Sequence, residues 1–231
     1  MRSIVAIVLL LFFCLPGCSN SEGIPENDIK LPVGFHAVLK KSFDFDQVAV
    51  GLLPEGWTNR FTGRGAPGQW QVVLDDGNRV LAQLSQKYGG YHFNLAVYEG
   101  ISLKDLEIML DFKAVKGKED RGGGPVWRYK DANNYYVARA NPLEDNFRVY
   151  RVVNGDRQQL ASAQVDVPSG KWHKMKIRMI GDHIECFLNG RKFLDVIDST
   201  FDQGGRIGVW TKADAVTYFD NIEVKAISIK K

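Results

Sequence analysis

Strict alternation of apolar and polar residues is the feature that most constrains how this chain folds. In residues 105–112, one face takes only apolar side chains, which are Leu106, Ile108, Leu110 and Phe112. A period of two is what a half-buried β-strand requires, whereas an amphipathic helix repeats every 3.6 residues. The same alternation returns in residues 174–179 and 183–189, and no long segment shows a helical period. The sequence therefore predicts strands.

Tight-turn signals separate these strands. Asn-Gly pairs occur at 154–155 and 189–190, and an Asp-Gly pair occurs at 76–77. Asn-Gly between two alternating runs is the strongest short signal for a β-hairpin. Further strands are expected at 71–74, 79–82, 126–129, 135–140, 147–152, 192–196, 206–211 and 216–224. Many short antiparallel strands at this spacing indicate a β-sandwich or a barrel.

The N-terminal region predicts where the protein is located. A basic start precedes an apolar run over residues 4–15, and Leu15-Pro16-Gly17-Cys18 follows. This layout is typical of a secretory signal peptide and resembles the bacterial lipobox, which implies cleavage before Cys18 and lipidation of its thiol. An ordinary signal peptide or a membrane helix is the alternative, but the run is short of the roughly 20 residues that a span needs.

The resemblance to lipoproteins implies two segments before the folded domain. Residues 1–17 are expected to be the signal peptide, and residues 18–34 are expected to be the lipidated cysteine and a polar tether. Ser19, rather than Asp, follows Cys18, which implies the outer membrane of a bacterial cell envelope. A lipid anchor at Cys18 would make the membrane surface one partner of the protein.

Charge and cysteine content exclude other classes of function. The formal net charge is only +3, so composition does not indicate nucleic acid as a partner. Three cysteines are present: Cys14 leaves with the signal peptide and Cys18 is the lipid site, so Cys186 is alone in the mature chain. Cys186 alternates with apolar neighbours and is expected to be a small buried core residue.

Several segments carry a family resemblance. Gly-Pro-Val-Trp-Arg-Tyr-Lys-Asp-Ala-Asn-Asn-Tyr-Tyr at 124–136 and the segments 170–178, 187–191, 205–212 and 218–224 resemble concanavalin A-like, laminin-G-like jelly rolls. The domain looks most similar to the bacterial 3-keto-disaccharide hydrolase-like family, also labelled family 16 glycoside hydrolase-like. The resemblance implies an all-β fold, an antiparallel jelly-roll β-sandwich over residues 35–231, with any ligand groove on its concave face.

The first candidate site lies in the strand 135–141 and the turn after it. Alternation puts Tyr135, Val137, Arg139 and Asn141 on one face, just before a polar turn that contains Glu144 and Asn146. Arg128 lies near Arg139 if the preceding strand pairs with this one. Sugars offer hydroxyl groups, which planar donors and carboxylate acceptors bind well. A buried Arg–Glu pair beside a solvated turn is the alternative.

A second candidate lies in the strand 206–211 and its continuation. Trp210 and Lys212 share a face with the small residue Gly208, so Trp210 is a candidate shelf on which a sugar ring stacks. Packing of the indole in the core is the alternative.

Catalysis requires further groups. Glycoside hydrolysis uses two carboxylates, and the Glu-x-Asp-x-Glu motif of family 16 glucanases is missing from this sequence. Elimination on a keto-sugar needs a single base, for which His92, His173 and Glu144 are candidates, with Glu144 preferred as general acid or base. The histidines are scattered and show no metal-binding spacing.

A structural calcium ion is a further hypothesis. Concanavalin A-like sandwiches often bind one where the first and last strands meet, and the resemblance puts Asp44, Asp46 and Asp220 at those positions. Hard oxygen ligands suit calcium, and ordinary carboxylates at strand ends are the alternative.

Together these features predict a cell-envelope lipoprotein whose jelly-roll domain recognises carbohydrate. An enzyme that acts on oligosaccharides or 3-keto-disaccharides is the alternative, and a protein-interaction or scaffold domain is the second alternative.

Overall fold

A computed structural model describes residues 22–26 and 30–229 of the chain. The expected signal peptide, Cys18 and most of the expected tether lie outside these residues. The described part contains strands, turns and loops, and none of its segments is a helix long and apolar enough to cross a membrane.

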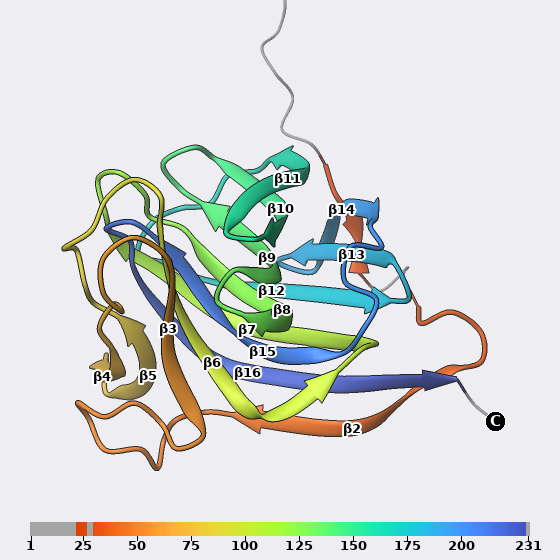
Figure 1. Ribbon diagram of the computed structural model, residues 1–231, viewed down its shortest axis with the longest axis horizontal. Helices are drawn as coiled ribbons and strands as arrows, with labels where there is room; N and C mark the ends of the chain where they lie inside the picture. The colour runs from red at the N-terminus through yellow and green to blue at the C-terminus, as the bar shows by residue number, and fades with distance from the viewer. Residues whose placement is uncertain (1–21, 27–29, 230–231) are drawn as a thin grey trace, which may run out of the picture.

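The larger layer, sheet A, has nine strands among the described residues. Its order is β1-β14-β13-β12-β7-β16-β5-β4, and β2 pairs with the far half of β16. The strands are β1 (Ile24–Pro25), β2 (Phe35–Phe43), β4 (Trp70–Asp75), β5 (Asn78–Gln83), β7 (Leu106–Lys116), β12 (Trp172–Ile180), β13 (His183–Leu188), β14 (Arg191–Ile197) and β16 (Val216–Ile229). In Figure 1, β2 and β16 run side by side along the lower side of the molecule, and the C-terminus lies beyond β16.

The other layer, sheet B, has seven strands in the order β11-β10-β9-β8-β15-β6-β3 within the same part of the chain. They are β3 (Trp57–Gly63), β6 (His92–Leu103), β8 (Gly123–Asp131), β9 (Asn134–Asn141), β10 (Asn146–Val153), β11 (Asp156–Gln164) and β15 (Gly205–Lys212). Every pairing in both sheets is antiparallel. The predicted antiparallel β-sandwich is confirmed.

The predicted hairpin turns are also present. Asn154 and Gly155 join β10 to β11, and Asn189 and Gly190 join β13 to β14, all four with φ between 49° and 83°. Two successive residues with positive φ give the turn a twist that matches the two strands it joins. The Asp-Gly pair at 76–77 has the same geometry between β4 and β5, with φ values of 50° and 87°.

The main hydrophobic core fills the space between the two sheets. Alternate residues of β7, β12 and β13 face alternate residues of β9, β10 and β15, and Cys186 lies among them. Trp127, Tyr136 and Phe112 are among the largest side chains in this core, and each is fully buried. Burial of such side chains provides most of the driving force for folding.

Part of the expected tether is docked on sheet A. Ile24 and Pro25 pair with β14, Glu26 forms an ion pair with the buried Lys176, and the carbonyl oxygen of Lys30 accepts a hydrogen bond from Arg178. Residues 24–26 and 30 of the expected polar tether thus contact sheet A. The alternation of β12 places Lys176 and Arg178 on the outer face of sheet A, where the docked segment covers them.

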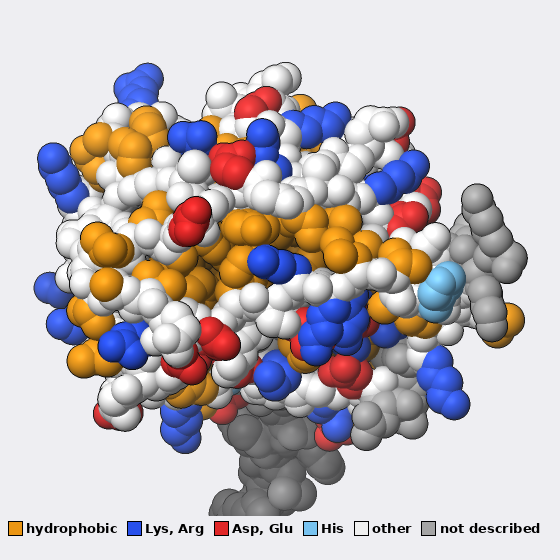
Figure 2. Space-filling model, turned by 90° about the horizontal axis from the view of Figure 1, so that it is seen from below, with side chains coloured by type: hydrophobic (Ala, Val, Ile, Leu, Met, Phe, Trp, Pro, Cys, Tyr) orange, Lys and Arg blue, Asp and Glu red, His pale blue; other side chains and the backbone are white. Residues whose placement is uncertain are grey.

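The side of the molecule on which β2 lies is shown in Figure 2. Hydrophobic side chains gather in a stripe across the middle of this face, and charged side chains surround them. Among the exposed apolar residues of the protein, Val38 and Leu39 belong to β2.

Candidate functional site

The face of sheet B that points away from sheet A carries a second apolar cluster. We call this face the concave face. Its cluster consists of Phe93, Leu95, Val97, Val126, Tyr129, Tyr135, Val137, Tyr150, Val152 and Trp210, all of them buried. An outer sheet face is normally solvated, so something must cover this one.

Sheet B covers the cluster by curling over it. The hydroxyl of Thr62 on β3 donates to the carbonyl oxygen of Ala132 in the β8–β9 turn, and it lies 2.8 Å from the hydroxyl of Tyr135 on β9. In the sheet, β8, β15 and β6 separate β9 from β3, so this contact requires strong curvature. A second contact joins the Tyr91 hydroxyl to the backbone N–H of Arg157 at the start of β11.

A polar array lies on the same face, beside the apolar cluster. The predicted face of β9 is confirmed, since Tyr135 and Val137 belong to the concave cluster while Tyr136 and Ala138 belong to the main core. Arg139 is the next residue on the concave side and is 1% exposed. We call Asp120, Arg139, Asn141, Glu144, Asn146, Arg148 and Lys212 the Arg139 array.

Arg139 holds three acceptors with one guanidinium. Its Nη1 donates to Asp120 Oδ2 at 2.9 Å, and its Nη2 donates to Glu144 Oε2 at 3.1 Å and to Asn146 Oδ1 at 3.0 Å. Asp120 is fully buried, and its Oδ1 accepts the backbone N–H of Gly122 at 2.9 Å. Charge-assisted bonds of this kind are stronger and more directional than neutral ones, so they fix the array in one geometry.

The other members of the array form its rim. The Glu144 side chain is 40% exposed, and Arg148 donates to its Oε2 at 2.8 Å. The Lys212 Nζ lies 3.5 Å from Asp120 Oδ2. Asn141 is buried, and its Oδ1 accepts the backbone N–H of Leu143, which shapes the turn that carries Glu144. The structure therefore brings together Arg139, Asn141, Glu144, Asn146 and Lys212 from the predicted set.

The charges in the array shift the pKa values of its members. Burial alone would lower the pKa of Arg139, but the adjacent carboxylates of Asp120 and Glu144 raise it above its ordinary value. Partial burial would raise the pKa of Glu144, but hydrogen bonds from Asn146 and Arg139 and the charge of Arg148 hold it below 4.5. Glu144 is therefore ionised near neutral pH and is suited to accept hydrogen bonds from a ligand.

Several polar groups beneath the rim have no hydrogen-bond partner among the described residues. They are Arg139 Nε, Arg157 Nη1, the Tyr150 hydroxyl and Trp210 Nε1. Burial raises the pKa of the neighbouring Tyr135 phenol, and the Thr62 hydroxyl and the Trp210 indole oppose part of this rise. Native proteins rarely leave buried polar atoms unpaired. Four such atoms therefore gather on the buried part of this face.

The Tyr150 ring lies close to the guanidinium groups of both Arg157 and Arg139. The guanidinium carbons of Arg157 and Arg139 lie 4.4 Å and 6.0 Å from the centre of the Tyr150 ring. Burial lowers the pKa of Arg157, and the positive charge of Arg139 adds to this effect. Asp120, Tyr150 and Arg157 were not predicted as site residues. Tyr150 could have been found from the alternation of 147–152, whereas Asp120 lies in a loop without a pattern.

Arg128 is not part of this array, and the expectation that it neighbours Arg139 is wrong. Trp127 stands opposite Tyr136, so the register places Arg139 further along β9. Arg128 has a φ of 44° at a bulge in β8, which turns its side chain away. It donates to the carbonyl oxygens of Lys104, Phe201 and Gly181. Arg128 therefore joins three loops of the sandwich.

Trp210 does not form the expected shelf. Its side chain lies on the concave face but is 0% exposed, because Phe93 packs against it at 5.1 Å and the guanidinium of Arg157 lies 5.7 Å from the ring centre. Trp210 is part of the concave cluster, and a sugar ring has no access to its face in this arrangement. The alternative of core packing is confirmed for this residue.

The expected calcium ligands are not gathered into one set. Within residues 22–26 and 30–229, the one group of three acidic or histidine side chains close enough to share an ion is His183, Glu185 and Asp195. Lys192 already bridges Glu185 and Asp195. Asp44 accepts the backbone N–H of Asp46. Asp220 is buried against Asn78 and Asn221 beneath the outer surface of sheet A.

The histidines offered as bases are both occupied. His92 contacts the Arg64 carbonyl oxygen through Nδ1 and the Asn94 side chain through Nε2. His173 contacts the Pro168 carbonyl oxygen and the side chain of Asn189 through its two ring nitrogens. Of the three proposed bases, Glu144 alone reaches the surface with a side chain that is substantially exposed.

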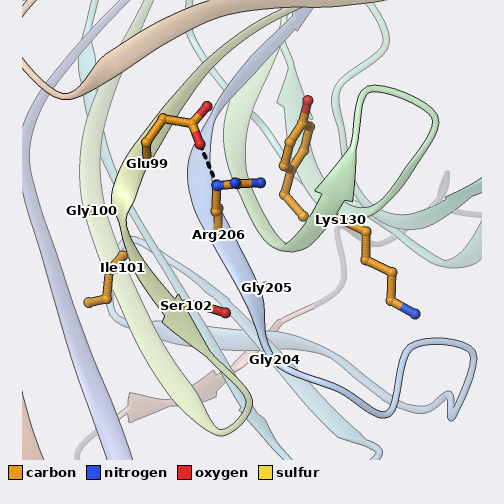
Figure 3. A pocket seen from close by; sticks show the side chains of 9 residues that line it. Glu99, Gly100, Ile101, Ser102, Lys130, Gly204, Gly205 and Arg206 are labelled. Carbon is orange, nitrogen blue, oxygen red and sulfur yellow. Dashed lines mark ion pairs between the residues drawn. The ribbon is translucent and has the colours of Figure 1, made fainter.

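A groove lies at another part of the concave face. Glu99, Tyr129, Lys130 and Arg206 line two adjoining hollows with volumes of about 450 and 460 Å³. Figure 3 shows the ion pair between Glu99 and Arg206 on the wall of this groove and Lys130 extending away from it. Volumes of this size are typical of sites for small molecules, which measure about 300–1,000 Å³.

Comparison with known proteins places the chain in a family. Residues 51–225 match the sequence model of the 3-keto-alpha-glucoside-1,2-lyase-like domain, which is most of the described part. The levanase of Bacillus subtilis (strain 168) is 28% identical over 111 residues, which are 47% of this chain and 16% of that enzyme. The match to the levanase is therefore confined to a small part of its length.

Solved structures share the fold. The carbohydrate-binding module CBM66 from Bacillus subtilis superposes with a TM-score of 0.61 at 24% identity, over 74% of this chain and 96% of the module. A protein of unknown function with a galectin-like fold, also from Bacillus subtilis, superposes with a TM-score of 0.59 at 11% identity, over 85% of this chain and 100% of its own. These similarities confirm the predicted jelly-roll β-sandwich.

Proposed function

This chain belongs to the 3-keto-alpha-glucoside-1,2-lyase-like domain family, and we propose that it recognises carbohydrate through the Arg139 array. The observation that carries this proposal is the single buried guanidinium of Arg139, which holds Asp120, Glu144 and Asn146 in one polar array with an exposed rim. The relation to CBM66 and to the levanase supports sugar as the class of ligand.

The chemistry of the array suits hydroxyl groups. A sugar hydroxyl both donates and accepts, so it can donate to the ionised Glu144 while it accepts from Lys212 or Arg148. A buried ion pair adds little net stability compared with apolar side chains of the same size, so stability alone does not account for Arg139 and Asp120.

Binding to a panel of oligosaccharides, measured by isothermal titration calorimetry, tests the proposal. Glu144→Gln keeps the size of an exposed side chain but removes the charge, so we expect it to fold and to weaken binding by about tenfold or more. Arg79→Gln is the matched control, because Arg79 is exposed and donates to the Asp46 carbonyl oxygen elsewhere. Equal affinity of Glu144→Gln and the wild type for every ligand would refute the assignment.

The family description favours a second candidate function, a lyase that acts on 3-keto-glucosides. Such a reaction removes the proton beside the ketone and expels the glycosidic oxygen from the neighbouring carbon, and it needs one base. Glu144 is the exposed candidate, although its lowered pKa makes it a weak base. Incubation with 3-keto-glycosides, followed by mass spectrometry, distinguishes the two functions. Product that forms with the wild type and is lost in Glu144→Gln would establish the lyase.

We also propose that the protein is anchored at the bacterial cell envelope, with the outer membrane favoured, through a lipid on Cys18. The sequence of residues 15–18 supports this proposal.

A further inference from the structure

The groove lined by Glu99 and Arg206 has three cationic side chains, Arg60, Lys130 and Arg206, and two carboxylates, Glu99 and Asp131. Arg60 Nη2 donates to Glu99 Oε1 at 3.5 Å, and Arg206 forms its ion pair with Glu99 through Nε. Two guanidinium groups thus share one carboxylate. Asp131, at the end of the groove, already accepts from the Asn133 backbone and the Asn134 side chain.

The two terminal nitrogens of the Arg206 guanidinium, Nη1 and Nη2, remain available as hydrogen-bond donors. No hydrogen bond from its Nη1 or Nη2 occurs within the described residues, and the side chain is 42% exposed. The two outer N–H groups of a guanidinium match the spacing of the two oxygens of a carboxylate, which is a geometry that lysine cannot offer. The charge and the geometry of the groove both favour an anion with two coplanar oxygens.

The remaining wall of the groove suits a sugar ring. Thr58, Ser102 and Tyr129 line it, and each carries a hydroxyl group; that of Thr58 donates to Glu99 Oε1 at 2.7 Å and can still accept. Gly100, Gly204 and Gly205 form the part of the wall where no side chain projects. At Gly205 an added Cβ would lie 2.4 Å from the backbone of Arg128, so the close packing of the strands requires glycine there.

We propose that the groove binds a uronic acid, with its carboxylate on the Arg206 guanidinium and its ring hydroxyls on the side chains of the wall. This inference extends the proposed carbohydrate recognition to a second, acidic type of sugar. It does not require the Arg139 array, because the two sites share no residue.

The test is binding of the soluble domain to oligosaccharides of galacturonate, glucuronate and mannuronate, each compared with its methyl ester. The ester keeps the ring and removes the charge, so we expect the acids to bind at least about tenfold more tightly than the esters. Arg206→Gln should remove this difference, and Arg206→Lys should restore only part of it. Raising the salt concentration should weaken binding of the acids, because the pair is exposed to solvent.

Arg79→Gln is the matched control. Arg79 is an exposed arginine that donates to the Asp46 carbonyl oxygen and lines neither hollow, so the preference for acids should survive this change. Wild-type protein that binds no uronate, or binds the esters equally well, would overturn the inference, as would undiminished binding by Arg206→Gln. Tighter binding of sulfated sugars than of uronates would also overturn it, in favour of a sulfate site. The two proposals can fail separately. If the wild type binds neutral glycans, Glu144→Gln does not, and no uronate binds, the groove proposal fails while carbohydrate recognition by the Arg139 array stands.

Discussion

At the residue scale, Arg139 and Arg128 show two different uses of a buried arginine. Both are 1% exposed. The guanidinium of Arg139 is paired with carboxylates and an amide at the edge of a surface. Arg128 donates mainly to backbone carbonyl oxygens of three loops, with one longer contact of 3.4 Å to the Asp105 carboxylate. The first arrangement leaves charged groups available to a ligand, and the second only holds the fold together.

Replacement of Arg128 should therefore affect stability strongly. Arg128→Met leaves the carbonyl oxygens of Lys104, Phe201 and Gly181 without their donor, and each unpaired buried group costs about 1–3 kcal/mol. We expect the free energy of unfolding to fall by about 3 kcal/mol or more in urea titrations. Arg79→Met, at an exposed arginine, should change it by less than about 0.5 kcal/mol. Equal stability of both variants would show that the loops have other partners.

The ionised state of Glu144 predicts how the Arg139 array responds to acid. Its pKa is held below 4.5 by Asn146, Arg139 and Arg148 despite partial burial. A carboxylate with a lowered pKa adds stability above its unfolded pKa, and this stability is lost as the pH falls through its folded pKa. The difference in melting temperature between the wild type and Glu144→Gln should therefore be largest near neutral pH and should shrink below about pH 4.5. A difference independent of pH would show that the charge of Glu144 plays no part.

At the element scale, the β8–β9 turn is the contact that curls sheet B. Thr62 reaches both the Ala132 carbonyl oxygen and the Tyr135 hydroxyl, so one threonine connects β3 to this hairpin. Thr62→Val keeps the shape but leaves both partners unpaired, which should lower the free energy of unfolding by about 1–3 kcal/mol. Ser42→Ala, at an exposed hydroxyl on β2, is the control. If both changes had the same small effect in urea titrations, the turn would not be held by Thr62.

Most elements could be predicted from the sequence, but their curvature could not. The alternation of 105–112 and 135–141 gave both the strands and the correct faces, because each strand packs one face on the main core. β11 was missed because its residues alternate weakly between polar and apolar. β6 was missed because both of its faces are buried: Phe93, Leu95 and Val97 lie in the concave cluster, and the other face combines the buried polar His92 and Asn94 with Ala96.

The errors at the site have the same origin. Trp210 was a candidate shelf for a sugar ring because the small residue Gly208 shares its face. The contacts that curl sheet B are far apart in sequence, as between Thr62 and Tyr135, and no local pattern indicates them. Arg139, Glu144 and Asn146 were found because they are close together in the chain and lie on one strand and its turn. Asp120 comes from a separate loop, held by three backbone N–H groups that donate to Asp214.

At the scale of the whole molecule, the N-terminal segment connects the domain to its predicted location. Replacement of Cys18 by serine removes the thiol that the lipid would modify, so Cys18→Ser should move the protein from the membrane fraction to the soluble fraction of a bacterial host and abolish labelling with radioactive palmitate. Cys186→Ser is the control, because this thiol is buried in the domain. Labelling that persists in Cys18→Ser would exclude the lipid anchor.

The curl of sheet B also determines which strands unfold locally first and which last. Amide hydrogens exchange with solvent through local or global opening, and the segments with the most buried surroundings open last. The central strands β8, β9 and β15 are packed between two apolar clusters, one on each side, whereas sheet A has a core on one side only. Amides of these three strands should therefore be the last in the chain to take up deuterium. The scaffold that carries both proposed sites would thus persist while the edges of sheet A fray and re-form.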